Sequence, residues 1–216
     1  MLEGPGGSRG WTGARHCAPA GTACYAFLVT AAPQLRFSFR EYLRVDSESP
    51  AKHEYLDGTI LAMAGGSPDH AALAMAVGAS LQRQLEGKRC RVYSADLRVR
   101  VLSTGFAGYP DVTVVCNRLE RDPEDGSTAT NPTVVVEILS PSTEQYDRGE
   151  KLRQYQQLAS LLHVVLVAHD DQRIDLWSRS ETGWVLTTAD AGGRVRLDGI
   201  DCALAVDDIY RDPLSL

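Results

Sequence analysis

Two acidic side chains lie within apolar, valine-rich segments of the chain. Asp111 begins the segment Asp-Val-Thr-Val-Val, and Glu137 follows three valines in Thr-Val-Val-Val-Glu-Ile-Leu. Carboxylates are seldom buried without a partner, because an apolar core solvates their charge poorly. If the two segments form an antiparallel hairpin that pairs Cys116 with Pro132, the same register places Asp111 opposite Glu137.

Two carboxylates that face each other on neighbouring strands need a cation between them. Directly opposed residues have Cβ atoms about 4.5–5.5 Å apart, where like charges are destabilising. Mg²⁺ suits this position because it prefers oxygen ligands and commonly binds one or two carboxylates together with waters and a substrate phosphate. A bound divalent ion activates water and polarises a phosphoryl oxygen. Asp111 and Glu137 therefore predict a metal site suited to phosphodiester hydrolysis.

A lysine follows the second acid at a useful position. The chain leaves the Glu137 segment through Ser-Pro-Ser-Thr, and Asp147 with Glu150 then has the spacing of a helix capping box. This helix start places Lys151 in the first turn, near the same end of the sheet. An ammonium there would stabilise the charge that develops on a transferred phosphate.

Each of these three residues also has a purely structural interpretation. Asp111 follows Pro110 and suits a turn or the start of a strand. Glu137 suits a buried ion pair with an arginine or a lysine. Lys151 alone suits a solvated helix face. Their combination favours the chemical interpretation.

The surrounding sequence predicts an α/β (α+β) fold in which a mixed β-sheet is flanked by helices. A short helix is expected after Ser38, ending near Asp46, and a long one from Ser67-Pro68 to Gly87. The continuous valine runs indicate central strands that are covered on both faces. Strands are expected at 54–61, with an Asp57-Gly58 turn, and at 90–94, 96–102, 111–116, 132–139, 164–168, 173–177 and 184–188.

The composition predicts one main domain that folds in water. A chain of 216 residues with 44% hydrophobic and 23% charged residues can bury a full core. Residues 1–37 lack apolar periodicity and are expected to form a flexible leader before a domain at 38–216. No apolar run approaches the roughly 20 residues that a membrane helix requires. The five cysteines are scattered without a C-x-x-C pair, which predicts neither a disulfide framework nor a zinc site and favours a reducing cytoplasm.

The charge pattern leaves nucleic-acid binding open. A net charge of -6 argues against a dedicated nucleic-acid coat, because phosphate binding depends chiefly on clustered lysine and arginine. Two local basic clusters can contact phosphate or form an ordinary solvated surface. They comprise Arg83, Lys88, Arg89, Arg91, Arg98 and Arg100, and then Arg148, Lys151 and Arg153.

The acids and the lysine belong to a longer pattern. Pro-Asp stands at 110–111, Glu-Ile-Leu-Ser-Pro-Ser-Thr at 137–143, and Asp, Lys and Tyr at 147, 151 and 155. Over roughly residues 38–210 the chain resembles a restriction-endonuclease-like family of bacterial proteins within the PD-(D/E)XK superfamily. The resemblance implies an αβββαβ nuclease core and dependence on Mg²⁺ or Mn²⁺.

The resemblance also implies further site residues. Glu54 matches an acid that completes the metal shell or orients water, with an exposed acid at a hairpin edge as the alternative. His70 matches a residue that contacts phosphate or supports a ligand, although a lone helical histidine is more often structural. Asp96 fits a position that braces the site. Leu139 stands where the superfamily normally has its lysine, and the resemblance implies that Lys151 on the following helix replaces it.

Three functions are compatible with these residues. The first and favoured one is a Mg²⁺-dependent endonuclease that cuts DNA at a centre formed by Asp111, Glu137 and Lys151. The second is a metal-free nucleic-acid-binding or scaffold protein built on a nuclease fold, and the third is a hydrolase of another phosphoester. A homodimer is expected by analogy, because a two-fold operator matches the symmetry of duplex DNA.

Overall fold

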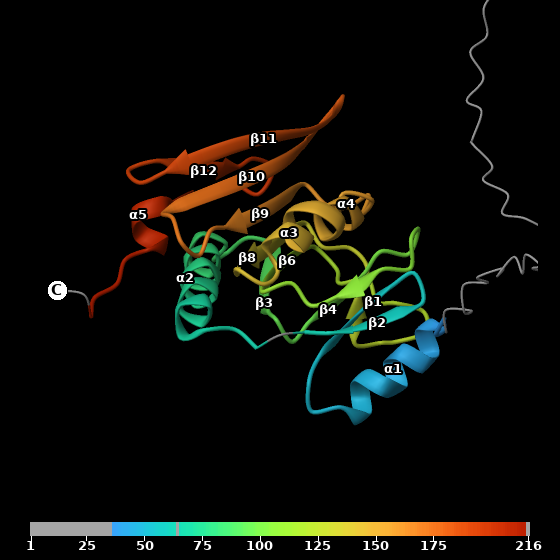
Figure 1. The fold of residues 1–216 in the computed structure, drawn as a ribbon. Helices are drawn as coiled ribbons and strands as arrows, with labels where there is room; N and C mark the ends of the chain where they lie inside the picture. The colour runs from blue at the N-terminus through green and yellow to red at the C-terminus, as the bar shows by residue number, and fades with distance from the viewer. Residues whose placement is uncertain (1–35, 64, 215–216) are drawn as a thin grey trace, which may run out of the picture. The chain divides into compact units, whose positions relative to one another are not determined.

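The computed structural model describes residues 36–63 and 65–214, so the expected leader up to residue 35 lies outside it. A six-stranded sheet runs in the order β11-β10-β9-β8-β6-β3 (Figure 1). Its strands are β3 (Cys90–Ser94), β6 (Val112–Cys116), β8 (Val134–Ile138), β9 (His163–Val167), β10 (Arg173–Ser180) and β11 (Gly183–Asp190).

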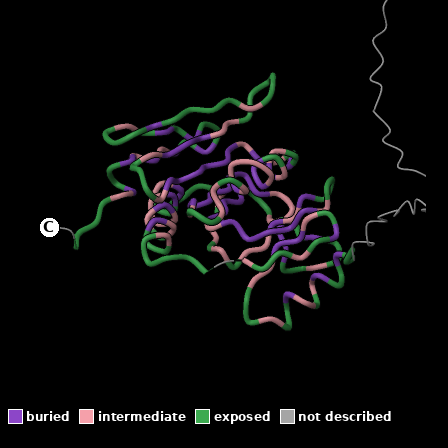
Figure 2. Tube along the Cα trace, in the orientation of Figure 1, coloured by how far each residue is buried: buried purple, intermediate pink, exposed green. Residues whose placement is uncertain are grey.

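The register between β6 and β8 confirms the predicted hairpin. Val112 pairs with Val136 and Val114 with Val134 in an antiparallel ladder, and one further step places Asp111 opposite Glu137. Strand β9 continues the sheet parallel to β8. Figure 2 shows both strands buried along their lengths, as continuous valine runs predict.

One face of this sheet packs against the long helix α2 (Pro68–Gln84). Ser67 caps the helix by accepting a hydrogen bond from the backbone N–H of His70, which confirms the predicted start. Leu73, Val77 and Leu81 of α2 pack on the β8 valines that point to this face. The core on this side is completed by a third sheet and a short helix that the sequence did not indicate: β12 (Arg194–Leu197), β13 (Cys202–Ala205) and α5 (Val206–Ile209).

The opposite face is covered by α3 (Glu144–Tyr146), a single π-helical turn at Asp147–Lys151 and α4 (Leu152–Tyr155). The predicted capping box at Asp147 was wrong. Ser140 accepts the backbone hydrogen bonds of Thr143 and Glu144, so the helix begins earlier and Asp147 is already helical. The Asp147 side chain is therefore free to turn into the core.

A second sheet, in the order β2-β1-β5-β4-β7, lies against this covered face. Asp57 and Gly58, with φ angles of 46° and 83°, form the predicted turn of its hairpin. Helix α1 (Phe39–Glu48) packs on the hairpin through Phe39, Tyr42 and Tyr55. The strands are β1 (His53–Leu56), β2 (Thr59–Ala62), β4 (Arg98–Arg100), β5 (Ala107–Gly108) and β7 (Thr128–Ala129).

The two arginines of β4 are held in ion pairs rather than solvated. Arg98 forms ion pairs of 2.6 Å with Asp46 and 2.5 Å with Asp125, and its side chain is only 11% exposed. Arg100 pairs with Asp122 at 2.9 Å. Strand alternation correctly separated the basic face of β4 from the core, but the acids that cover it come from distant segments of the chain.

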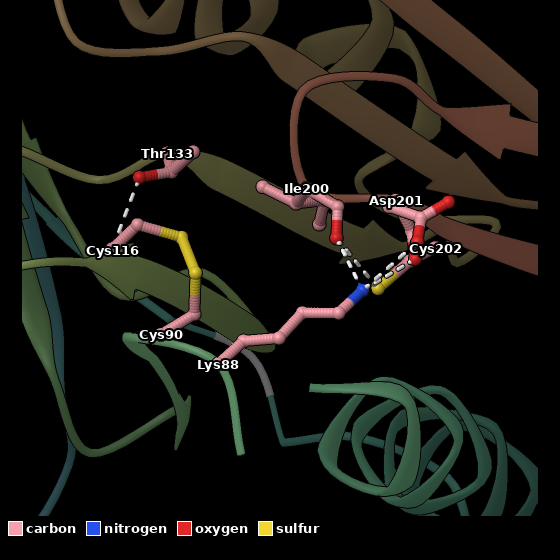
Figure 3. The surroundings of a disulfide bond; sticks show 7 residues. All are labelled: Lys88, Cys90, Cys116, Thr133, Ile200, Asp201 and Cys202. Atoms are coloured by element: carbon pink, nitrogen blue, oxygen red, sulfur yellow. Dashed lines mark hydrogen bonds and ion pairs between the residues drawn. A yellow bond between two sulfur atoms is a disulfide. The ribbon is translucent and has the colours of Figure 1, made fainter. Parts of the chain in front are cut away.

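Cys90 and Cys116 form a disulfide, as Figure 3 shows. The expectation of no disulfide was wrong, because the two cysteines meet as directly opposed residues of β3 and β6 rather than as a local motif. The bond joins β3 to the end of β6 that is remote from Asp111. Cys202 is a free, buried cysteine. No helix in the described part of the chain is both long and apolar enough to cross a membrane.

Candidate active site

A cleft of about 570 Å³ opens at the end of the six-stranded sheet where Asp111 lies. It gathers five of the predicted site residues from five separate segments. These are Glu54 of β1, His70 of α2, Asp111 before β6, Glu137 of β8 and Lys151 of the π-helical turn. Ser140, Thr143, Tyr146 and Asp147 also line the cleft. The proximity that was predicted for the two acids and the lysine is therefore present.

Lys151 lies among three carboxylates. Its Nζ atom is 2.7 Å from Oε1 of Glu54, 3.1 Å from Oε1 of Glu137 and 3.4 Å from Oδ1 of Asp147. All four side chains are at most 6% exposed. The lysine is therefore the internal cation of a buried acidic cluster, and its interpretation as a solvated helix residue was wrong.

Burial sets the electrostatics of this cluster. Desolvation raises the pKa of Glu137 well above its usual range, although the Lys151 ammonium opposes the shift. Desolvation acts to lower the pKa of Lys151, but the surrounding carboxylates, Glu137 first, raise it. Lys151 is therefore the cation that these buried acids share. Strongly shifted groups that share a cleft are typical of functional sites.

Glu137 is also bound by a phenol. The hydroxyl of Tyr155 donates a 2.8 Å hydrogen bond to Oε1 of Glu137, and both residues are buried. Tyr155 lies in α4, one turn after Lys151. The helical segment that follows the Ser-Pro-Ser-Thr loop therefore supplies both the ion-pair partner and the hydrogen-bond donor of Glu137.

Asp111 is held from two directions at the mouth of the cleft. Its Oδ2 atom accepts a 2.7 Å hydrogen bond from the backbone N–H of Ile138 and lies 3.3 Å from Nε2 of His70. The contact with Asp111 raises the pKa of His70. The Asp111 side chain is 14% exposed, so it is more accessible than Glu137.

Glu54 is buried rather than exposed at the hairpin edge, which rules out the alternative interpretation of this residue. It lies on the inward face of β1, with a relative exposure of 4%. A Cβ atom at Gly108 would lie 3.1 Å from Oε1 of Glu54, so the glycine makes room for this carboxylate.

Asp96 does not belong to the cleft. Its carboxylate forms a 2.6 Å ion pair with Lys52 and is 85% exposed. Its position in the sequence matched the family pattern, but Asp96 lies in the exposed turn between β3 and β4. The expectation that Asp96 braces the site was therefore wrong.

Asp147 and Tyr155 are the contacts that the choice of site residues missed. The spacing of Asp147 and Lys151 by four residues on one helix was a usable signal, because such residues lie on the same face. Tyr155 lies a further four residues along. The capping-box interpretation placed Asp147 before the helix, so this row of residues spaced by four was not recognised as one helix face.

The donor chemistry of the cleft fits a hydrated divalent ion. Within residues 36–63 and 65–214, no three His, Cys, Asp or Glu side chains are arranged to share one ion. Mg²⁺ needs fewer protein ligands, because it commonly takes one or two carboxylates and keeps several waters. Asp111 and Glu137 supply such a pair, and their contacts use only Oδ2 and Oε1. Glu54 is already bound to Lys151.

Comparisons with known proteins identify the family of the chain. The model of the Uma2 family, described as "Putative restriction endonuclease", matches residues 39–207. In Synechocystis sp., the uncharacterized protein slr1290 is 38% identical over 181 residues, which cover 83% of this chain and 94% of that protein. The uncharacterized protein sll1609 is 24% identical over 148 residues, or 68% and 84% of the two chains.

A solved structure shares the fold. The protein from Anabaena variabilis described as "a putative nuclease belonging to DUF820" superposes with a TM-score of 0.63 at 16% identity. The match covers 75% of this chain and 91% of that one. The α+β architecture of mixed sheets and helices is therefore a nuclease-like fold. By the extent of the family match, this chain belongs to the Uma2 family of restriction-endonuclease-like proteins.

Proposed function

We propose that this protein is a nuclease that uses Mg²⁺ or Mn²⁺ to hydrolyse phosphodiester bonds in DNA. The observation that supports it best is the meeting of Asp111, Glu137 and Lys151 in one cleft, on adjacent strands and the following helix. Family membership supports the same reaction class.

Asp111 and Glu137 would hold the ion, which supplies a polarised phosphoryl oxygen and a water of lowered pKa when bound. The His70 imidazole and the Ile138 N–H fix the Asp111 carboxylate. Tyr155 fixes Glu137 in the same way. The Lys151 ammonium provides positive charge for the phosphate as negative charge develops on it.

The choice of DNA rests on the family description, because a restriction endonuclease cuts DNA. The cleft itself offers phosphate little positive charge. Lys151 is the single lysine or arginine among the described residues that line it. Phosphate therefore has few protein cations to bind in the cleft, and the metal would provide much of the attraction. We further propose a homodimer, since cutting both strands of a duplex suits a two-fold arrangement of sites.

The proposal is tested by incubating the protein with plasmid, single-stranded DNA and RNA, with and without Mn²⁺. Cleavage of DNA that needs the ion and is lost in Asp111→Asn supports it. Asp96→Asn is the matched control, because it removes the same charge from an exposed position outside the cleft. Metal binding with cleavage of neither nucleic acid would instead favour another phosphoester substrate. Nucleic-acid binding without metal binding would favour a scaffold.

A further inference from the structure

We propose that Lys151 is the resident counter-ion of the metal-free site and that it must leave Glu54 and Glu137 before a divalent ion can bind. The inference rests on the proposed function, because it concerns how the same site exchanges one cation for another. The contacts of Lys151 with Glu54 and Glu137 then belong to the metal-free cleft and not to the metal-bound form that would react.

The first step of the argument is geometric. The Lys151 Nζ atom lies 2.7 Å and 3.1 Å from the Oε1 atoms of Glu54 and Glu137. Mg²⁺ binds carboxylate oxygens at about 2.0–2.1 Å and demands near-octahedral geometry. An ion held by Asp111 and Glu137 would lie beside the Glu137 carboxylate that the ammonium already contacts, so the two cations would compete for it. With side chains at most 6% exposed, little water is present to screen the repulsion between the two cations.

The second step is the charge of the cluster. Three carboxylates, those of Glu54, Glu137 and Asp147, surround a single ammonium. These acidic side chains share one ammonium as their cation, whereas a divalent ion would supply twice the charge in a smaller volume.

The third step concerns where the ammonium goes. Asp147 contacts Lys151 at 3.4 Å from one helical turn earlier, and it too lines the cleft. Because both residues belong to the same π-helical turn, this contact can persist when the lysine leaves the glutamates. Asp147 is then the positioning residue that keeps the ammonium at the cleft, where the phosphate would bind.

The chain is well suited to a direct test because it contains three lysines, Lys52, Lys88 and Lys151. Amine acetylation of the unmodified protein, followed by mass spectrometry, reports each lysine separately. In EDTA, Lys151 should react far more slowly than Lys52, whose side chain is 40% exposed. Saturating Mg²⁺ should raise the rate at Lys151 at least tenfold and leave Lys52 unchanged. A rate at Lys151 that stayed constant or fell with Mg²⁺ would overturn the proposal.

A second test measures metal affinity without any activity assay. Mn²⁺ binding, followed by electron paramagnetic resonance of the free ion, should be at least tenfold tighter in Lys151→Met than in the parent protein. Lys52→Met, the matched control, should bind as the parent does. If Lys151→Met is unfolded in EDTA, added Mn²⁺ should refold it, because the ion replaces the missing counter-charge. Failure to refold would count against the displacement.

The outcomes separate this inference from the proposed function. Equal Mn²⁺ affinity in the parent and in Lys151→Met would overturn the displacement and leave the metal-dependent nuclease intact. Absence of Mn²⁺ binding in both proteins would overturn both.

Discussion

The ammonium of Lys151 lies 2.7 Å from the carboxylate of Glu54. Glu54 belongs to the five-stranded sheet, whereas the helical segment that carries Lys151 packs on the six-stranded sheet. The ion pair marks the place where the two sheets meet. Glu137 reaches the same ammonium from the six-stranded sheet. The candidate site is thus built across the junction of the two sheets.

Replacing Glu137 by Gln tests its role as a metal ligand. The substitution keeps the volume and removes a negative oxygen, so Mn²⁺ affinity should fall at least tenfold and any cleavage should fall with it. The free energy of unfolding in EDTA should change by no more than about 1 kcal/mol, because Lys151 keeps Glu54 and Asp147 as partners. A loss of about 3–5 kcal/mol would show that Glu137 serves mainly as a buried salt bridge.

Lys151→Met tests the chemical role of the ammonium. Removing one charge-stabilising group from an enclosed site should lower single-turnover cleavage about 100-fold, or about 2.7 kcal/mol in the barrier. Lys88→Met is the control, because Lys88 contacts the backbone carbonyls of Ile200 and Asp201 away from the cleft. Cleavage by Lys151→Met at the parental rate would assign Lys151 a structural role only.

Arg98→Met tests whether the basic strand serves folding or nucleic-acid binding. Its loss would leave Asp46, 5% exposed, without its cation, so unfolding in urea should become easier by about 3–5 kcal/mol. Arg91→Met is the control, because it removes an exposed arginine of β3. It should change the free energy of unfolding by less than about 0.5 kcal/mol. Similar small changes in both variants would contradict the structural role of Arg98.

His163 predicts a pH dependence of stability. Burial lowers its pKa below the ordinary 6.5, and its Nε2 atom lies 2.6 Å from the backbone carbonyl of Asp198. The unfolded chain therefore binds a proton more readily, so the free energy of unfolding falls as the pH drops below about 6.5. His163→Gln keeps a donor and cannot titrate, so its urea-unfolding curves from about pH 7.5 to 5 should show a shallower decline. An identical decline in both proteins would remove His163 as its cause.

The parts of the site that could be predicted depend on local pairing. Asp111 and Glu137 were placed opposite each other because a hairpin register follows from residue positions alone. Lys151 could be brought near them because the next helix along the chain after the Glu137 strand carries it. Glu54 could be predicted as a site residue only from the family resemblance, because its contact with Lys151 depends on how the two sheets pack.

The errors arose where contacts outside a short sequence pattern decided the structure. Alternation assigned Arg98 to the polar face, but it could not show that Asp46 and Asp125 neutralise it. The spacing of Asp147 and Glu150 is typical of a capping box, yet the Ser140 carbonyl starts the helix earlier. The disulfide depends on the pairing of β3 with β6, which no cysteine spacing encodes.

Crystals of the protein grown with saturating Mn²⁺, with diffraction data collected at the manganese absorption edge, provide the most direct test of the metal centre. The account predicts one anomalous peak within bonding distance of a carboxylate oxygen from both Asp111 and Glu137. It also predicts that the Lys151 ammonium has moved away from Glu54. Well-ordered carboxylates with no peak between them, and Lys151 still 2.7 Å from Glu54, would contradict it.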